Sequence, residues 1–259
     1  MDFRKRFDEV AELYDAIRPR YPAALFAALV RQAGLRQDAR LLEIAPGTGQ
    51  ATLPLARQGF GITAVELGAR MADLARDRLR AYPAVNVLQG AFEDVELPAG
   101  AFDLVYCATA FHWIAPEIRF AKSHALLKPL GHIAIIHRHH VSDERGDAFT
   151  AATQPIYRRH EPHAAGGARA YVPRRWAELE PAPIEGALFV PVSFAVFPEA
   201  VCYSGRQYAQ LLSTYSPTLA MSPELRRSFL NDIEHLIAVQ FGGQIVQHYA
   251  VSLQIARKT

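Results

Sequence analysis

The sequence has few cysteines, no long apolar run and almost no surplus of charge. Its only cysteines, Cys107 and Cys202, lie far apart among 259 residues, which excludes a disulfide scaffold and favours a reducing compartment. No apolar stretch approaches the roughly 20 residues of a membrane-spanning helix, and MDFRKRFDEV at the N-terminus lacks the apolar stretch of a secretory signal. The formal net charge of +2 disfavours nucleic acid or a membrane surface as the main partner.

The composition is otherwise that of an ordinary globular protein. Hydrophobic residues make up 50% of the chain and charged residues 21%, which argues against disorder. A chain of this length can bury a sizeable core, as one large domain or as one domain with an insertion. We therefore expect a soluble cytoplasmic protein that is a monomer or a homodimer.

Short apolar segments alternate with helix-like segments through the first half of the chain. They predict strands over 39–45, 61–66, 84–90, 101–109 and 132–138. This alternation is typical of an α/β fold with a parallel sheet and helices on both faces, whose ligands bind beyond the carboxyl ends of the strands.

The second half predicts a cap and two more strands. Residues 142–186 show little periodicity and indicate an irregular cap with short helices, whereas 187–197 is a strand in which Pro191 favours an edge or a bulge. Residues 244–258 alternate as a last strand, antiparallel beside 187–197. The expected fold is a Rossmann-like seven-stranded mixed sheet, with five parallel strands, a C-terminal antiparallel pair and a helical cap.

This division suggests two parts within one overall domain. Residues 1–140 would form the ligand-binding core with an N-terminal lid helix, and 141–259 the cap, the last two strands and a helical insertion. A helix is expected over 222–241, where Ser222 offers an N-cap. The insertion YSGRQYAQLLSTYSP, which precedes this helix, is expected to roof a pocket and to contribute Tyr208 to it.

A glycine-rich turn, LLEIAPGTGQ, follows the first predicted strand. Gly47 and Gly49 allow a ligand to approach the backbone closely, and the N–H groups of the next helix point toward it. Glu66 ends the second strand and is well placed to accept two ribose hydroxyls. Glu43 would lie under the turn, where it fixes the turn or faces an ammonium group. The simpler alternative is an ordinary turn at a sheet edge.

Five segments in order resemble the class I S-adenosylmethionine-dependent methyltransferases. LLEIAPGTGQ matches the glycine-rich motif, AVELGARM the ribose acid, QGAFEDVELP the adenine segment, and AFDLVYCATAFHWI and LLKPLGHIAII the fourth and fifth strands. The resemblance covers roughly residues 10–140. FDEVAELYDAIRPRYP and FHWI are most similar to the branch with the trans-aconitate methyltransferases and the type 11 methyltransferase domain.

The resemblance implies S-adenosyl-L-methionine as cofactor and an N-terminal lid over it, with a merely amphipathic helix at the sheet edge as the alternative. Ala45 stands where the family commonly has glycine, and Ala91 where it frequently has Asp. The expected cofactor-binding residues are Tyr14, Glu43, Ala45, Gly47, Gly49, Glu66, Leu67, Met71, Phe92, Glu93 and Cys107.

His112, just past the fourth strand, is the candidate catalytic base, with a structural histidine as the alternative. A hydroxyl or a protonated amine needs such a base, whereas a carboxylate acceptor does not. Arg18 would pair with a carboxylate, face solvent or pair with Asp15. The candidate substrate contacts are Arg18, Tyr21, Trp113, His137 and Tyr208.

Residues 137–140, HRHH, are expected to be mainly a solvated strand end, with a pocket contact as the alternative. Neighbouring histidines on a strand point to opposite faces, and no Cys or carboxylate spacing supports a metal. No metal is therefore expected.

The sequence predicts a methyltransferase acting on a small-molecule acceptor, most simply an oxygen nucleophile such as a carboxylate or hydroxyl, with nitrogen and carbon open. The alternative is a cofactor-binding protein of the same fold that transfers no methyl, either pericyclase-like or regulatory. An NAD fold is disfavoured because Thr52 stands where its fingerprint requires a small residue. Methylation of nucleic acid or protein is disfavoured because no basic run or base-flipping motif occurs.

Overall fold

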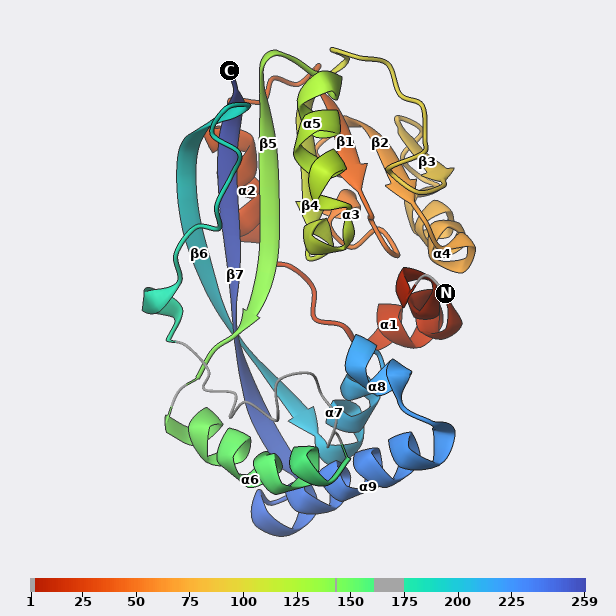
Figure 1. The fold of residues 1–259 in the computed structure, drawn as a ribbon, viewed down its shortest axis with the longest axis vertical. Helices are drawn as coiled ribbons and strands as arrows, with labels where there is room; N and C mark the ends of the chain where they lie inside the picture. The colour runs from red at the N-terminus through yellow and green to blue at the C-terminus, as the bar shows by residue number, and fades with distance from the viewer. Residues whose placement is uncertain (1–2, 143, 161–174) are drawn as a thin grey trace.

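The computed structural model describes residues 3–142, 144–160 and 175–259, and one seven-stranded mixed sheet forms its centre (Figure 1). The strand order is β3-β2-β1-β4-β5-β7-β6, with β7 antiparallel to both of its neighbours and the first five strands parallel. This confirms the predicted fold class. The strands are β1 (Arg40–Ile44), β2 (Gly61–Glu66), β3 (Val85–Gln89), β4 (Phe102–Ala108), β5 (Leu127–His140), β6 (Phe189–Ser204) and β7 (Gln244–Lys258).

The central parallel strands β1 and β4 are mostly apolar and buried because helices cover both faces of the sheet. In β1, Leu41 packs into a core with α2 (Ala23–Gln32), α3 (Thr52–Ala56) and α4 (Ala69–Leu79). Its neighbour Leu42 packs into a second core on the other face. That second core contains Phe120 and Leu126 of α5 (Pro116–Leu126). Successive side chains of a strand point to opposite faces, so each strand supplies both cores.

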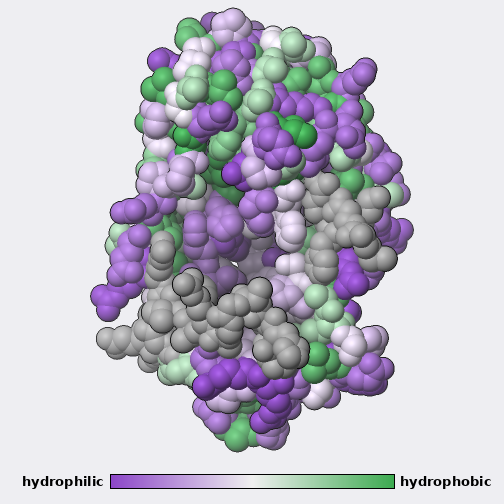
Figure 2. Space-filling view, in the orientation of Figure 1, coloured by the Kyte–Doolittle hydropathy of each residue, from purple (hydrophilic) through white to green (hydrophobic). Residues whose placement is uncertain are grey.

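The N-terminal segment crosses the carboxyl ends of the parallel strands. It contains the 3-10 helix η1 (Phe3–Val10) and α1 (Ala11–Ile17), which contact α8 (Ser216–Ala220) and α7 (Gly205–Leu212), respectively. Both α7 and α8 lie between β6 and β7 in the chain, as the predicted insertion does (Figure 1). Figure 2 shows a hollow near the middle of this face, between the sheet and the helices below it.

The expectation of an irregular cap over 142–186 is wrong for its first part. Residues 144–160 form one helix, α6 (Glu144–His160), with Pro155 inside it. Phe149 and Ile156 are buried in a third core with α9 (Pro223–Gln240). This burial offsets the helix-breaking tendency of proline, because tertiary packing supplies most helix stability. Residues 161–174 of the expected cap lie outside the described residues.

Two strands are longer than the sequence indicated. β5 begins at Leu127 rather than 132, so it includes Pro129 and Gly131, and a register shift against β4 accommodates them. β6 continues to Ser204. The interpretation of Pro191 is confirmed, since β6 is the edge strand and its pairing shifts register just after this proline.

Among the helices within residues 3–142, 144–160 and 175–259, none combines the length and the apolar character that crossing a bilayer requires.

Candidate functional site

The glycine-rich turn after β1 adopts left-handed backbone conformations. Gly47 and Gly49 have φ of 58° and 80°, and Ala45 has φ of 53° although it carries a Cβ. A Cβ at Gly49 would lie 3.2 Å from Leu79 Cδ1, so this glycine allows α4 to pack closely against the turn. The conformation of Ala45 explains physically why glycine suits this position.

Replacing Ala45 by glycine is expected to change the free energy of unfolding by less than about 1 kcal/mol. A left-handed conformation costs a residue with a Cβ about 1–2 kcal/mol, whereas the extra chain entropy of glycine costs roughly 0.5–1 kcal/mol. The two effects largely offset each other. Chemical denaturation of the two proteins measures the difference, and a loss above about 2 kcal/mol would show that the Ala45 methyl group contributes packing instead.

Glu66 lies at the end of β2 and is only 7% exposed. Its carboxylate accepts the N–H of Gly47 at 2.8 Å and the N–H of Gly68 at 2.9 Å. Burial raises the pKa of the Glu66 carboxyl, and these backbone hydrogen bonds oppose the rise. An ionised carboxylate has about four lone-pair positions, so these backbone donors leave room for a further donor. This arrangement fits the vicinal hydroxyls of a ribose.

Glu43 lies beneath the turn and is fully buried. The Tyr106 hydroxyl donates a hydrogen bond to Glu43 Oε2 at 2.7 Å. Burial raises the pKa of the Glu43 carboxyl to about 7. The carboxyl group is not among those that line the neighbouring cavity, which begins at Ala45 on the other side of the turn.

A cavity with a volume of about 460 Å³ lies between the turn, the end of β4 and the N-terminal segment. A smaller cavity of about 80 Å³ adjoins it and shares Ala45, Glu66 and Trp113 with it. The predicted residues that line the larger cavity are Tyr14, Arg18, Tyr21, Ala45, Gly47, Glu66, Met71, His112 and Trp113. Leu67 and Phe92 line the smaller one.

Six predicted site residues line neither cavity: Glu43, Gly49, Glu93, Cys107, His137 and Tyr208. Cys107 points into the α5 core, where burial raises the pKa of its thiol. Glu93 Oε1 accepts the backbone N–H of Ala115 at 3.4 Å. Neither side chain lines either cavity, because other parts of the protein contact it, and residue order alone does not determine such contacts.

His137 and Tyr208 lie outside both cavities. The His137 ring contacts the His112 ring, with 5.9 Å between their centroids. Tyr208 is buried in the core beneath α9, where its ring packs against Phe149. The expectation that Tyr208 faces the pocket fails because α7 turns this residue toward α9.

The cavity also contains side chains that the sequence interpretation did not select. Thr109 follows β4 with φ of 62°, and its hydroxyl lies 2.9 Å from the Tyr21 hydroxyl. Tyr215, in the link between α7 and α8, lines the same space. His140 at the end of β5 does so too, which agrees with the pocket contact given as the alternative for residues 137–140 and not with a solvated strand end. Thr109 could have been selected from the sequence, because it directly follows the predicted fourth strand. No local pattern distinguished Tyr215 from other tyrosines of the insertion.

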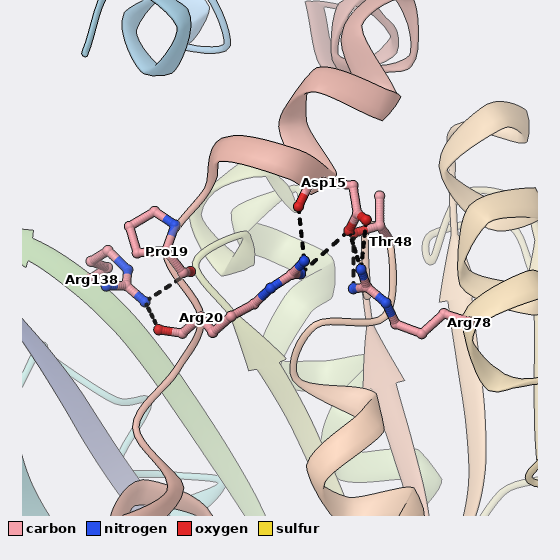
Figure 3. Close-up of polar contacts among 6 residues, drawn as sticks. All are labelled: Asp15, Pro19, Arg20, Thr48, Arg78 and Arg138. Atoms are coloured by element: carbon pink, nitrogen blue, oxygen red, sulfur yellow. Dashed lines mark hydrogen bonds and ion pairs between the residues drawn. The ribbon is translucent and has the colours of Figure 1, made fainter. Parts of the chain in front are cut away.

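A polar network holds the N-terminal segment on the turn (Figure 3). The Asp15 carboxylate of α1 accepts hydrogen bonds from the Thr48 hydroxyl of the turn and from Arg78 of α4. Burial alone would raise the pKa of Asp15, but Thr48, Arg78 and Arg20 outweigh it and hold the pKa below its usual value. The Arg138 guanidinium donates to the backbone carbonyls of residues 19 and 20, at 3.2 Å and 2.8 Å. These contacts keep the segment over the cavity.

His112 lies exposed at the cavity, in the short 3-10 turn after β4. Burial of the covered part of its ring, together with Arg119, lowers its pKa. The ring is therefore largely neutral at pH 7 and able to accept a proton. His137 and His139 share one side of β5, with ring centroids 4.6 Å apart. Within the part of the chain that the structure describes, no cluster of three metal-ligating side chains occurs.

Comparison with known proteins agrees with this arrangement. Residues 42–135 match the family described as "Methyltransferase domain". The chain is 27% identical to an uncharacterised methyltransferase-like protein of Schizosaccharomyces pombe, over 83% of this chain and 79% of the relative. Further curated methyltransferases match over about half of their own length.

Solved structures show the same fold. A protein described as a putative type II methyltransferase, from Anaeromyxobacter dehalogenans, superimposes with a TM-score of 0.63 and 24% identity, over 93% of this chain and 97% of that one. A Haemonchus contortus phosphoethanolamine N-methyltransferase, solved with phosphomonomethylethanolamine and S-adenosylhomocysteine, gives a TM-score of 0.53 and 15% identity, over 100% and 60%. The family match thus covers the glycine-rich turn and most of the first five strands, so residues 42–135 are similar to a methyltransferase domain. The solved structures show that the chain shares the fold of these proteins.

Proposed function

We propose that the larger cavity binds S-adenosylmethionine at the glycine-rich turn and a small acceptor with an oxygen nucleophile beside His112 and Thr109. This proposal rests mainly on one observation: a single cavity of about 460 Å³ is lined by Glu66, by the turn and by these two residues. Pockets of this size suit small molecules. When bound, the cofactor supplies an electrophilic methyl group on a sulfonium.

Different residues of the cavity would bind the ribose, the adenine and the methionine part of the cofactor. Glu66 offers its carboxylate oxygens to the ribose hydroxyls. Leu67 and Phe92, which line the smaller cavity, are placed to enclose the adenine. Ala45 and Gly47 leave room beside the backbone for the methionine part, with Tyr14 facing it from the lid.

The acceptor would lie on the side of the cavity away from Glu66. Thr109 and Tyr21 present hydroxyl groups there, and His112 is able to take a proton from an acceptor hydroxyl. A carboxylate acceptor needs no such base. The lid and the insertion close over this space, which orients the acceptor and excludes water.

The test is incubation with S-adenosylmethionine that carries a labelled methyl group, together with panels of small carboxylic acids, phenols, alcohols and amines. We expect label in an acid, phenol or alcohol product. Label released as methanol by mild alkali identifies a methyl ester, whereas alkali-stable label identifies an ether. Transfer only to amines would overturn the oxygen assignment. Cofactor binding without transfer to any panel member would favour a protein that binds the cofactor for another purpose.

A further inference from the structure

Arg18 caps the C-terminal end of α1 and is held in a defined position on the cavity wall. Its Nε donates to the Thr214 hydroxyl and its Nη2 to the Thr214 carbonyl, each at 2.8 Å. The guanidinium carbon lies 4.7 Å from the centroid of the Tyr14 ring and 4.2 Å from that of the Tyr215 ring. Two rings and two hydrogen bonds fix the plane of this group, so little side-chain entropy remains to be lost when a ligand binds.

This guanidinium has no carboxylate partner among the described residues. Asp15, the acid nearest in the chain, pairs with Arg20 and Arg78 instead. The sequence also allowed Arg18 to face solvent or to pair with Asp15. Neither alternative holds, because Arg18 is partly buried and Asp15 pairs with Arg78. Thr214 occupies the edge of the guanidinium formed by Nε and Nη2. The terminal edge, formed by Nη1 and the second N–H of Nη2, keeps the geometry for a bidentate carboxylate.

The surrounding charges leave Arg18 as an uncompensated positive charge. Arg138 is neutralised by Glu199, with 2.6 Å between Nη1 and Oε2. Burial, Arg18 and Arg138 lower the pKa of His140 to about 4, so this ring is neutral at pH 7. Among the described residues that line the cavity, the acidic side chain is Glu66, at the cofactor end. A partly buried cation without an anion is costly, and an anionic ligand relieves that cost.

We propose that Arg18 binds a carboxylate of the methyl acceptor, which makes the acceptor an organic acid with a second oxygen nucleophile. This inference rests on the proposed function and specifies its substrate class. The anchored carboxylate is not the methylated group, because donation of its lone pairs to Arg18 reduces its nucleophilicity. The methylated oxygen therefore belongs to a second carboxylate or a hydroxyl, placed toward His112 and Thr109.

The cofactor has a carboxylate of its own, and the surroundings of Arg18 favour the acceptor as the source. Both of its hydrogen bonds go to Thr214 of the insertion, and the nearer of its two rings is Tyr215 of the insertion, whereas Tyr14 faces the methionine part. At the turn itself, the side chains of Asp15, Thr48 and Arg78 hydrogen-bond to one another.

The first measurement separates the two carboxylates by calorimetric titration with S-adenosylhomocysteine and with 5′-methylthioadenosine, which lacks the amino acid part. The proteins are the wild type, Arg18→Gln, Arg18→Lys and the control Arg31→Gln, which removes an exposed arginine at the end of α2. We expect each affinity to change less than threefold. A tenfold loss for S-adenosylhomocysteine in both Arg18 variants would overturn the proposal. If that loss spared methylthioadenosine, Arg18 would bind the carboxylate of the cofactor.

The second measurement titrates protein saturated with S-adenosylhomocysteine with acids and their matched amides: fumarate and fumaramide, 4-hydroxybenzoate and 4-hydroxybenzamide, 4-hydroxycinnamate and its amide. We expect at least one acid to bind tenfold or more tightly than its amide. This preference should be lost in Arg18→Gln, partly retained in Arg18→Lys and unchanged in Arg31→Gln. Equal binding of acid and amide, retention in Arg18→Gln, or binding of no acid would overturn the inference. Intact cofactor binding would show that the proposed function itself survives.

Discussion

Replacing Glu66 by glutamine is expected to weaken the binding of S-adenosylhomocysteine by roughly 100-fold or more. Hydrogen bonds to a charged group contribute about 1.5–3 kcal/mol each and neutral ones about 0.5–1.5 kcal/mol. Glutamine would remove one charged bond to the ribose and make the other neutral, which is a loss of roughly 2.5–4.5 kcal/mol. The amide nitrogen of glutamine cannot accept a hydrogen bond from Gly47, Gly68 or a ribose hydroxyl. Isothermal titration calorimetry at pH 7.5 measures the change.

The control for this prediction is Glu96→Gln, which neutralises an exposed glutamate of the loop after β3. It should bind the nucleoside as the wild type does. Thermal unfolding without ligand shows whether Glu66→Gln still folds, and Glu66→Asp offers a second variant that retains the charge. A loss below about fivefold in a folded Glu66→Gln protein would contradict the assignment of Glu66 to the ribose.

Replacing Glu43 by glutamine is expected to remove a pH dependence of stability. The pKa of Glu43 in the folded protein is about 7, against an ordinary value of 4.5. Between these values the folded protein retains a proton that the unfolded chain has released. The contribution of Glu43 to the free energy of unfolding is thus complete below about pH 4.5 and is lost as the pH rises to about 7. At about 1.4 kcal/mol per pKa unit, the loss is about 3 kcal/mol.

Urea denaturation of the wild type and Glu43→Gln between pH 4.5 and 7.5 measures this difference. The glutamine oxygen is still able to accept the hydrogen bond of Tyr106. Glu66 has a raised pKa of its own, but it is present in both proteins and cancels in the comparison. Parallel curves for the two proteins would mean that Glu43 titrates at its ordinary pKa, and Glu96→Gln should parallel the wild type.

The strand ends were predictable because their signals are local. β2 begins and ends at the residues that the sequence indicated, Gly61 and Glu66, since an apolar run bounded by polar residues marks a buried strand. The carboxyl ends of parallel strands meet at one sheet edge, so Glu66, Gly47 and His112 could be placed near one another before any coordinates. The cavity that joins them confirms that proximity.

Features that depend on side-chain direction were not predictable. The sequence placed Glu43 under the turn but left open whether it fixes the turn or faces an ammonium group. The structure places its carboxylate against the Tyr106 hydroxyl, outside the cavity that Ala45 lines. Helix α6 was not predicted because its apolar residues show no clear helical period. Its buried apolar residues Phe149 and Ile156 pack against α9, which is distant in sequence.

The sequence alone determined the succession of strands along the chain, the glycine-rich turn and the resemblance to methyltransferases, because each follows from residues adjacent in the chain. Only the tertiary structure decided which side chains face the cavity. Asp15 meets residues 33 and 63 positions away, and Arg18 binds Thr214 across 196 positions. Contacts at such separations arise from the packing of whole elements, which no local periodicity encodes. The uncompensated charge of Arg18 became visible only once its surroundings were assembled.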